Sequence, residues 1–159
     1  MSRLPRLGPR GEGWVVVQAV LLVAVLVAGQ SAGNAWAGVA ASLAWVVGAG
    51  LLAVAAFMVG RGFVDLGRNL TPLPRPRDGA QLVQTGIYGL VRHPLYGGLI
   101  LGCLGYALLT ASVVALLLAC LVAVFFSLKS RREEAWLLEH FDGYAAYMTR
   151  TRRFIPWVY

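Results

Sequence analysis

The longest stretch of the chain without a charged side chain runs from Leu95 to Leu128, a length of 34 residues. One α-helix of this length would be about 50 Å long, whereas the apolar core of a bilayer is about 30 Å thick. Two short membrane helices joined by a tight turn fit the stretch better. Thr110 and Ser112 supply polar side chains at its midpoint. We therefore expect a helical hairpin, with one helix over 94–109 and the next over 112–128.

Two more apolar runs precede this hairpin. The first extends from Trp14 to Gly33, and the second extends from Trp36 to Val59 without an ionisable residue. Each run is long enough to cross a bilayer as a helix. With 58% hydrophobic and 13% charged residues and a mean hydropathy of +0.69, the composition is not that of a soluble domain. The sequence predicts an all-α membrane bundle of about four transmembrane helices, over 14–33, 36–59, 94–109 and 112–128, in a single domain over 1–159.

The positive charges all fall on one side of this predicted bundle. Of the fourteen Lys and Arg residues, three precede the first helix, five lie between 61 and 92, and six follow Leu128. Positive residues collect on the cytoplasmic side of membrane proteins. Both termini and the 61–92 loop are therefore expected in the cytoplasm, and the protein is expected in the inner (plasma) membrane. The net charge of +7 then faces anionic membrane lipids, and we do not expect nucleic-acid binding.

The two long polar segments are expected to differ in structure. The 61–92 loop carries Pro72, Pro74 and Pro76, which forbid a continuous helix and favour extended backbone. The segment 129–159 places apolar residues at mixed spacings of three and four. That spacing predicts a cytoplasmic amphipathic helix lying at the membrane interface.

The residues best suited to chemistry lie where the hairpin begins. Arg92 and His93 precede a helix-starting proline, and Tyr88 and Tyr96 flank them. One interpretation is structural, because arginines and aromatic residues commonly anchor helices at the membrane interface. The other is that a cation, two phenols and an imidazole that titrates near neutral pH converge to hold a polar cofactor. Both interpretations remain open on these residues alone.

The two hairpin helices carry further candidates. Gly98 and Gly102 are four residues apart, a spacing that favours either close helix packing or close approach of a ligand. Glu133 and Glu134 are adjacent and so point about 100° apart on a helix. One of them can accept hydrogen bonds from a cationic ligand while the other pairs with an arginine. Lys129 lies four residues before Glu133, so an ordinary surface ion pair is the alternative.

Common catalytic and metal-binding patterns do not account for this chain. Cys103 and Cys120 each lie inside an apolar run with no second Cys or His at ligand spacing. Both are expected to be small core residues, and no metal site is predicted. The sequence also holds no phosphate-binding glycine loop and no His-Glu-x-x-His pattern.

The order and spacing of the motifs resemble those of the membrane-embedded S-adenosylmethionine methyltransferases related to isoprenylcysteine carboxyl methyltransferase and phospholipid methyltransferase. The resemblance covers about Asn69 to Pro156. Where this family often has Pro and Arg, the chain has Ile87 and Gly89, and where the isoprenylcysteine branch often has Arg, it has Lys129. The matching motifs are Asn69-x-Thr71-Pro72-x-Pro74, Gly86-x-Tyr88, Arg92-His93-Pro94-x-Tyr96-x-Gly98, Glu133-Glu134, and a tail from Phe141 through Tyr144, Tyr147 and Arg153 to Pro156.

The resemblance implies methyl transfer from S-adenosylmethionine to a lipophilic or small acceptor that enters from the bilayer. An amine acceptor must lose a proton, and Glu133 or His93 could take it, with Glu133 as the candidate catalytic residue. The alternative is an NADPH-dependent membrane reductase of the sterol-reductase type, because those enzymes have a similar C-terminal arrangement of helices. The residues that the resemblance implies for cofactor binding are Tyr88, Arg92, His93, Tyr96, Gly98, Glu133 and Glu134.

Overall fold

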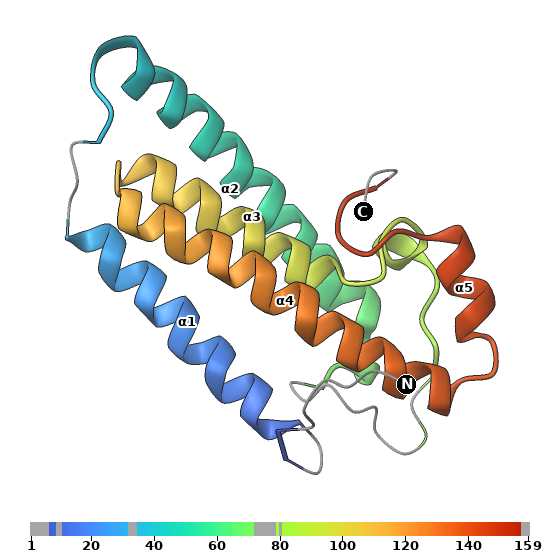
Figure 1. Cartoon of the computed structure of the whole chain (residues 1–159). Coiled ribbons are helices and arrows are strands. Elements are labelled where there is room, and N and C mark those ends of the chain that lie inside the picture. The colour runs from blue at the N-terminus through green and yellow to red at the C-terminus, as the bar shows by residue number, and fades with distance from the viewer. Residues whose placement is uncertain (1–6, 9–10, 32–34, 72–78, 80, 157–159) are drawn as a thin grey trace.

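The computed structural model describes residues 7–8, 11–31, 35–71, 79 and 81–156 (Figure 1). The described residues form an all-α bundle, as the sequence predicts. Three of its helices are long and apolar enough to cross a membrane, and α3 is a shorter apolar helix. The elements in chain order are α1 (Glu12–Gln30), α2 (Gly38–Leu66), the short 3-10 helices η1 (Gly67–Asn69) and η2 (Gly86–Gly89), α3 (Pro94–Leu109), α4 (Val113–His140) and α5 (Tyr144–Arg150).

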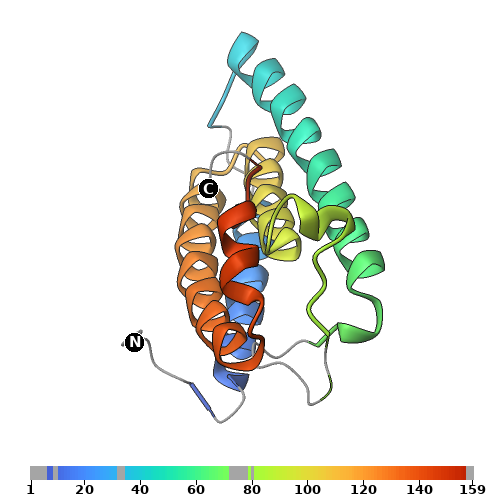
Figure 2. The ribbon, with the colours of Figure 1, turned by 90° about the vertical axis from the view of Figure 1, so that its right-hand side faces the viewer.

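The hairpin of α3 and α4 occupies the middle of the bundle. α1 packs mainly on α4 and α2 packs on α3, so the first two helices flank the hairpin from opposite sides (Figures 1 and 2). The turn between α3 and α4 falls at the predicted place. Ser112 is the N-cap of α4, where its hydroxyl accepts a hydrogen bond from the Ala115 backbone N–H at 3.2 Å. The same hydroxyl donates to the Ala28 carbonyl at 3.0 Å, which ties the turn to the end of α1.

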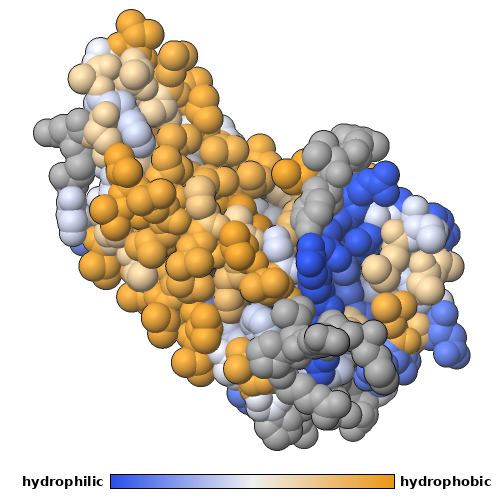
Figure 3. Space-filling view, viewed as in Figure 1, coloured by the Kyte–Doolittle hydropathy of each residue, from blue (hydrophilic) through white to orange (hydrophobic). Residues whose placement is uncertain are grey.

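The outer faces of the bundle are apolar, as a lipid environment requires. Figure 3 shows a continuous hydrophobic surface over the body of the bundle and a hydrophilic region at the end that carries α5. Trp45 and Phe57 on α2 are both 64% exposed, and Leu117 on α4 is 66% exposed. Cys120 is also exposed on α4. The prediction that Cys120 is a core residue is therefore wrong, because a residue inside a membrane helix can face lipid as readily as protein.

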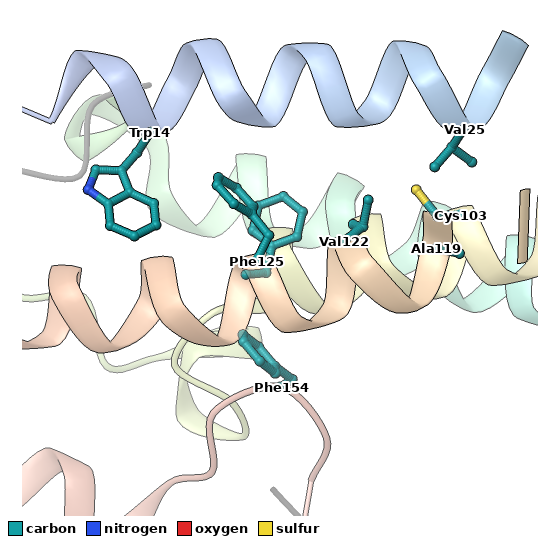
Figure 4. Close-up of a cluster of buried hydrophobic side chains, with 8 residues drawn as sticks. Trp14, Val25, Cys103, Ala119, Val122, Phe125 and Phe154 are labelled. Carbon is teal, nitrogen blue, oxygen red and sulfur yellow. The ribbon is translucent and has the colours of Figure 1, made fainter. Parts of the chain in front are cut away.

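A cluster of buried side chains joins α1 to the hairpin. Trp14 on α1 packs against Phe125 on α4, with ring centroids 5.6 Å apart, and Val25 lies about three turns further along α1 (Figure 4). Cys103 of α3 belongs to this cluster, as expected for a small core residue. Phe154, near the end of the described chain, also joins it. The C-terminal segment is thus anchored in the same core as the membrane helices.

Two helix boundaries differ from those predicted. α2 continues to Leu66, seven residues beyond the expected end, because Arg61 pairs with Asp65 one turn later at 2.7 Å. α4 continues through the charged segment to His140, after which the backbone of Phe141 is extended. The prediction of a single helix over 129–159 is therefore wrong. A short α5 follows α4, and residues 151–156 are not helical. The three prolines at 72, 74 and 76 lie outside the described residues.

Glycines allow α2 and α3 to approach closely. A Cβ atom added to Gly105 would lie 2.7 Å from the Gly48 carbonyl oxygen, and one added to Gly48 would lie 2.9 Å from the Gly105 carbonyl oxygen. Gly98 makes a similar contact further along the same interface, where an added Cβ would lie 3.0 Å from the Ala55 carbonyl oxygen. The small-residue spacing on α3 therefore serves helix packing.

We expect Gly105→Ala to destabilise the bundle by about 1–3 kcal/mol, because the new methyl group forces α2 and α3 apart. Gly60→Ala is the matched control on α2, since a Cβ there would meet nothing within 4 Å. Replacing a helical glycine with alanine in open space is expected to be neutral or to stabilise by up to about 1 kcal/mol. Thermal unfolding of the detergent-purified variants measures the difference, and equal melting temperatures would contradict the close packing.

Candidate functional site

A cavity of about 410 Å³ lies at the end of the bundle near α5. Side chains of α1, α2, α3, α4 and α5 line it, together with η2 and the segments that flank residues 72–80. A volume in this range suits a small-molecule ligand. Five of the seven predicted cofactor residues line the cavity: Tyr88, Arg92, His93, Tyr96 and Glu133.

The turn that carries Tyr88 is held by two other elements, α2 and α5. The Ile87 backbone N–H donates to Asp65 at 2.8 Å, and Gly86 before it has a φ of +60°, which favours glycine. The Tyr88 hydroxyl donates to the Gly62 carbonyl at 3.4 Å. The Tyr147 hydroxyl of α5 donates to the Tyr88 carbonyl at 2.6 Å. Tyr88 is therefore fixed between α2 and α5 at the edge of the cavity.

The residues before α3 pair with the C-terminal segment. The Arg92 backbone N–H donates to the Arg152 carbonyl at 2.8 Å, and the His93 backbone N–H donates to the Arg153 carbonyl at 3.0 Å. His93 is the N-cap of α3, and Pro94 takes the first helical position, where its missing N–H has no cost. A segment from the far end of the chain thus places Arg92 and His93 beside the cavity.

Glu134 lies behind these two side chains and is 3% exposed. Its carboxylate accepts from Arg92 Nε at 2.9 Å, from Arg153 Nη2 at 2.5 Å and lies 3.3 Å from His93 Nε2. Glu134 is six residues past the apolar part of α4 that ends at Leu128. Burial acts to raise the pKa of this carboxyl group, but the hydrogen bonds from His93, Arg153 and Arg92 outweigh it and hold the pKa well below its usual range.

A second polar group lies on the α1 side of the cavity. The Tyr96 hydroxyl donates to Glu133 at 2.5 Å. Lys129, which is 1% exposed, donates through Nζ to Gln18 of α1 at 2.5 Å, and this Nζ lies 5.0 Å from the centre of the Tyr96 ring. Lys129 is therefore a buried cation that lines the cavity. Its burial contradicts the alternative interpretation, in which Lys129 and Glu133 form an exposed ion pair on the surface.

The structure separates the predicted site residues into two groups. Arg92, His93, Tyr88, Tyr96 and Glu133 come together around the cavity. Glu134 and Gly98 do not line it: Glu134 binds the basic side chains behind it, and Gly98 faces α2.

Sequence reasoning left most cavity residues out of the site, and Gln18, Lys129 and Tyr144 are three polar ones among them. The signal at Gln18 was a single polar side chain within an apolar run, and the signal at Lys129 was a cation at the end of one. Neither position indicates which side chain it meets, because the two residues are 111 positions apart. Tyr144 belongs to the tail motif in the sequence, but the sequence does not show that Tyr144 is buried beside the cavity.

Burial also changes the tyrosines around the site. It raises the pKa of Tyr147 to about 12 and raises the pKa values of Tyr88 and Tyr144 above the usual phenol range. All three phenols are thus neutral hydrogen-bonding groups near neutral pH. Each has a higher pKa in the folded chain than in the unfolded chain, so each favours folding below pH 10 and loses that contribution as the pH rises.

We therefore expect the free energy of unfolding to fall between pH 10 and pH 12, by up to about 3 kcal/mol from Tyr147 alone, at about 1.4 kcal/mol for each pKa unit. Tyr147→Phe removes this titrating group and is expected to make the pH dependence less steep in that window, where Tyr88 and Tyr144 still contribute. Unfolding monitored by circular dichroism at each pH measures both proteins. An identical alkaline slope in the variant would contradict the role of Tyr147.

Comparison with known proteins places this chain in a family. The phospholipid methyltransferase family pattern matches residues 43–143, which include most of α2, all of α3 and α4, and the cavity residues between them. The nickel-cobalt-cadmium resistance protein NccN of Alcaligenes xylosoxydans xylosoxydans is 32% identical over 147 residues, which cover 90% of this chain and 62% of that protein. The chain thus spans less than two thirds of the length of this relative.

Two further relatives match a shorter part of the chain. The cobalt-zinc-cadmium resistance protein CzcN of Cupriavidus metallidurans is 40% identical over 76 residues, or 47% of this chain and 35% of that protein. The protein-S-isoprenylcysteine O-methyltransferase of Schizosaccharomyces pombe is 42% identical over 77 residues, or 47% of this chain and 33% of that enzyme. With the family pattern over more than half of its length and an apolar helical bundle around the matched residues, the chain belongs to the phospholipid methyltransferase family.

Proposed function

We propose that this protein transfers a methyl group from S-adenosylmethionine to a lipophilic or small acceptor that enters its cavity from the bilayer. The observation that carries the proposal is the cavity itself, which brings Arg92, His93, Tyr96 and Glu133 together at one end of an apolar bundle. The family supports the methyl transfer, whereas the donor and the acceptor are inferred from the chemistry of the lining side chains.

The unused hydrogen-bonding groups of the cavity fit this donor. Arg92 binds through Nε and Nη1, but its Nη2 bonds none of the described residues. The buried Tyr144 hydroxyl also has no partner within the described part of the chain. Arg92 suits the carboxylate of an amino acid, and the carboxylate of Glu133 suits positive charge. S-adenosylmethionine carries both kinds of group on one molecule.

The chain's own residues would then align the reaction and exclude water. The donor supplies an electrophilic methyl group, and the acceptor's nucleophile displaces the sulfur from it in line, so alignment is the main requirement. Glu133 is half-buried in the cavity wall, where Tyr96 holds one of its oxygens. A carboxylate or thiolate acceptor needs no base, whereas an amine acceptor would lose its proton to Glu133.

The acceptor would reach this wall from the lipid side. Val15 and Gln18 of α1 and Val59 and Phe63 of α2 line the cavity, and both helices present apolar outer faces. We propose that residues 1–159 form one methyltransferase domain, with both termini and the cavity on the cytoplasmic side of an inner (plasma) membrane. The placement of all fourteen positive residues supports this orientation.

Calorimetric titration of the detergent-purified protein tests the donor. We expect micromolar binding of S-adenosylhomocysteine, the product form of the donor, and no measurable binding of NADPH. Binding of NADPH alone would reassign the cavity to the reductase that the sequence left as an alternative. Binding of neither ligand by folded protein would contradict the proposal.

A further inference from the structure

The hydrogen bond between Glu134 and His93 has a consequence for the imidazole ring. The Glu134 carboxylate also binds two guanidinium groups, at 2.9 Å from Arg92 Nε and 2.5 Å from Arg153 Nη2. These two cations stabilise the ionised form of the buried acid. An ionised carboxylate can accept hydrogen bonds but cannot donate them.

His93 Nε2 lies 3.3 Å from this carboxylate, so Nε2 must carry the hydrogen. In a neutral imidazole, the other nitrogen is then an acceptor. None of the described residues bonds His93 Nδ1, and His93 lines the cavity. We infer that Glu134 is a positioning residue, which fixes the Nε2–H tautomer of His93 and leaves Nδ1 as a hydrogen-bond acceptor for a ligand in the cavity.

The surroundings of the ring support a single orientation. The His93 ring stacks on Tyr96 with 5° between the ring planes and centroids 5.3 Å apart, and Phe154 meets it edge-on at 6.2 Å. The charged and titratable groups that face it are Glu134, Arg92 and Tyr96, together with Arg153, which shares the same carboxylate. A 180° flip of the ring would put Cε1 in the place of Nε2 and break the hydrogen bond to Glu134, so this bond fixes one orientation of the ring.

The chemical class of the ligand group follows from the tautomer. Nδ1 accepts from an N–H or O–H donor, such as an ammonium group or a sugar hydroxyl, and does not bind a carboxylate. Arg92, and not His93, is therefore the residue suited to the carboxylate of the donor. Naming the ligand group as the amino or ribose group of S-adenosylmethionine rests on the proposed function, whereas the tautomer does not.

Nitrogen NMR of the full chain tests the tautomer directly. The sequence contains two histidines, so selective labelling with 15N-histidine gives two rings, and His140→Gln assigns them. Nε2 couples to both ring protons and Nδ1 couples to one, which identifies each nitrogen. In the spectrum of the full chain, we expect the hydrogen of the His93 ring on Nε2 and none on Nδ1. A hydrogen on Nδ1, a mixture of tautomers or a doubly protonated ring would each overturn the inference.

Variants separate the role of Glu134 from general effects of charge. In Glu134→Gln and Glu134→Ala, we expect the Nδ1–H tautomer to appear, because the carboxylate acceptor is gone. Glu139→Gln makes the same charge change at an exposed position on α4 and should leave the spectrum of His93 unchanged. An unchanged Nε2–H spectrum in a folded Glu134→Ala protein would overturn the positioning role. Where neither variant folds, the wild-type spectrum decides.

Addition of S-adenosylhomocysteine to the labelled protein tests the ligand contact. We expect the His93 Nδ1 signal to move on saturation and the His140 signals to stay in place. Saturation without a shift at Nδ1 would overturn the contact. A protein with the Nε2–H tautomer that does not bind S-adenosylhomocysteine would contradict the proposed donor and leave the tautomer assignment intact.

Discussion

Replacing His93 with alanine is expected to weaken binding of S-adenosylhomocysteine by about 10- to 100-fold. The variant loses the proposed hydrogen bond at Nδ1, and a hydrogen bond to a charged group contributes about 1.5–3 kcal/mol. At about 1.4 kcal/mol for each factor of ten, this loss gives the stated range. The ring also fills space between Tyr96 and Phe154, so its removal loosens one wall of the cavity.

His140→Ala is the matched control for this prediction. His140 is exposed at the end of α4 and does not line the cavity, so its loss should change the affinity by less than about twofold. Calorimetric titration measures both variants at the same pH, and circular dichroism confirms that both remain helical. Wild-type affinity in a folded His93→Ala protein would mean that the imidazole does not contact the ligand, and the cavity would have to bind it through other residues.

The bundle could be predicted from the sequence because membrane helices are specified locally. A helix in lipid must satisfy its own backbone hydrogen bonds and present apolar side chains, and both requirements leave a long uncharged run in the sequence. Pro94 and Ser112 then mark where α3 and α4 begin, because each suits the first turn of a helix. The same local logic places Arg92, His93 and Tyr96 at one end of α3.

Contacts between distant segments could not be predicted in this way. Whether Glu134 faces the cavity or the arginines depends on where Arg153 lies, and Arg153 is positioned by backbone pairing of residues 152–153 with residues 92–93. Lys129 likewise lies among charged neighbours in the sequence but is buried by Gln18 of α1. The sequence showed which residues could form a site. Only the packing of the helices determines that Glu133 lines the cavity while Glu134 binds the arginines.

A second large effect, on stability, is expected when the ion pairs of Glu134 are removed. Glu134→Leu is expected to lower the free energy of unfolding by about 3–5 kcal/mol, because it leaves two guanidinium groups without their shared carboxylate. The side chain of Arg92 is 9% exposed and that of Arg153 is 15% exposed, so water replaces the lost bonds poorly. Glu139→Leu, at an exposed position on the same helix, should change stability by no more than about 0.5 kcal/mol.

A double-mutant cycle with Arg153→Leu separates this ion pair from simple loss of packing. Arg153→Leu alone should cost less than Glu134→Leu, since Glu134 keeps its bond to Arg92 at 2.9 Å. The double variant should cost less than the sum of the two single variants, because Glu134→Leu then no longer takes a carboxylate partner from Arg153. Unfolding in mixed micelles measures all four proteins. Additive costs would mean that the two side chains stabilise the chain independently, and the C-terminal segment would then be held beside His93 by its backbone pairing and by Phe154 rather than by the carboxylate.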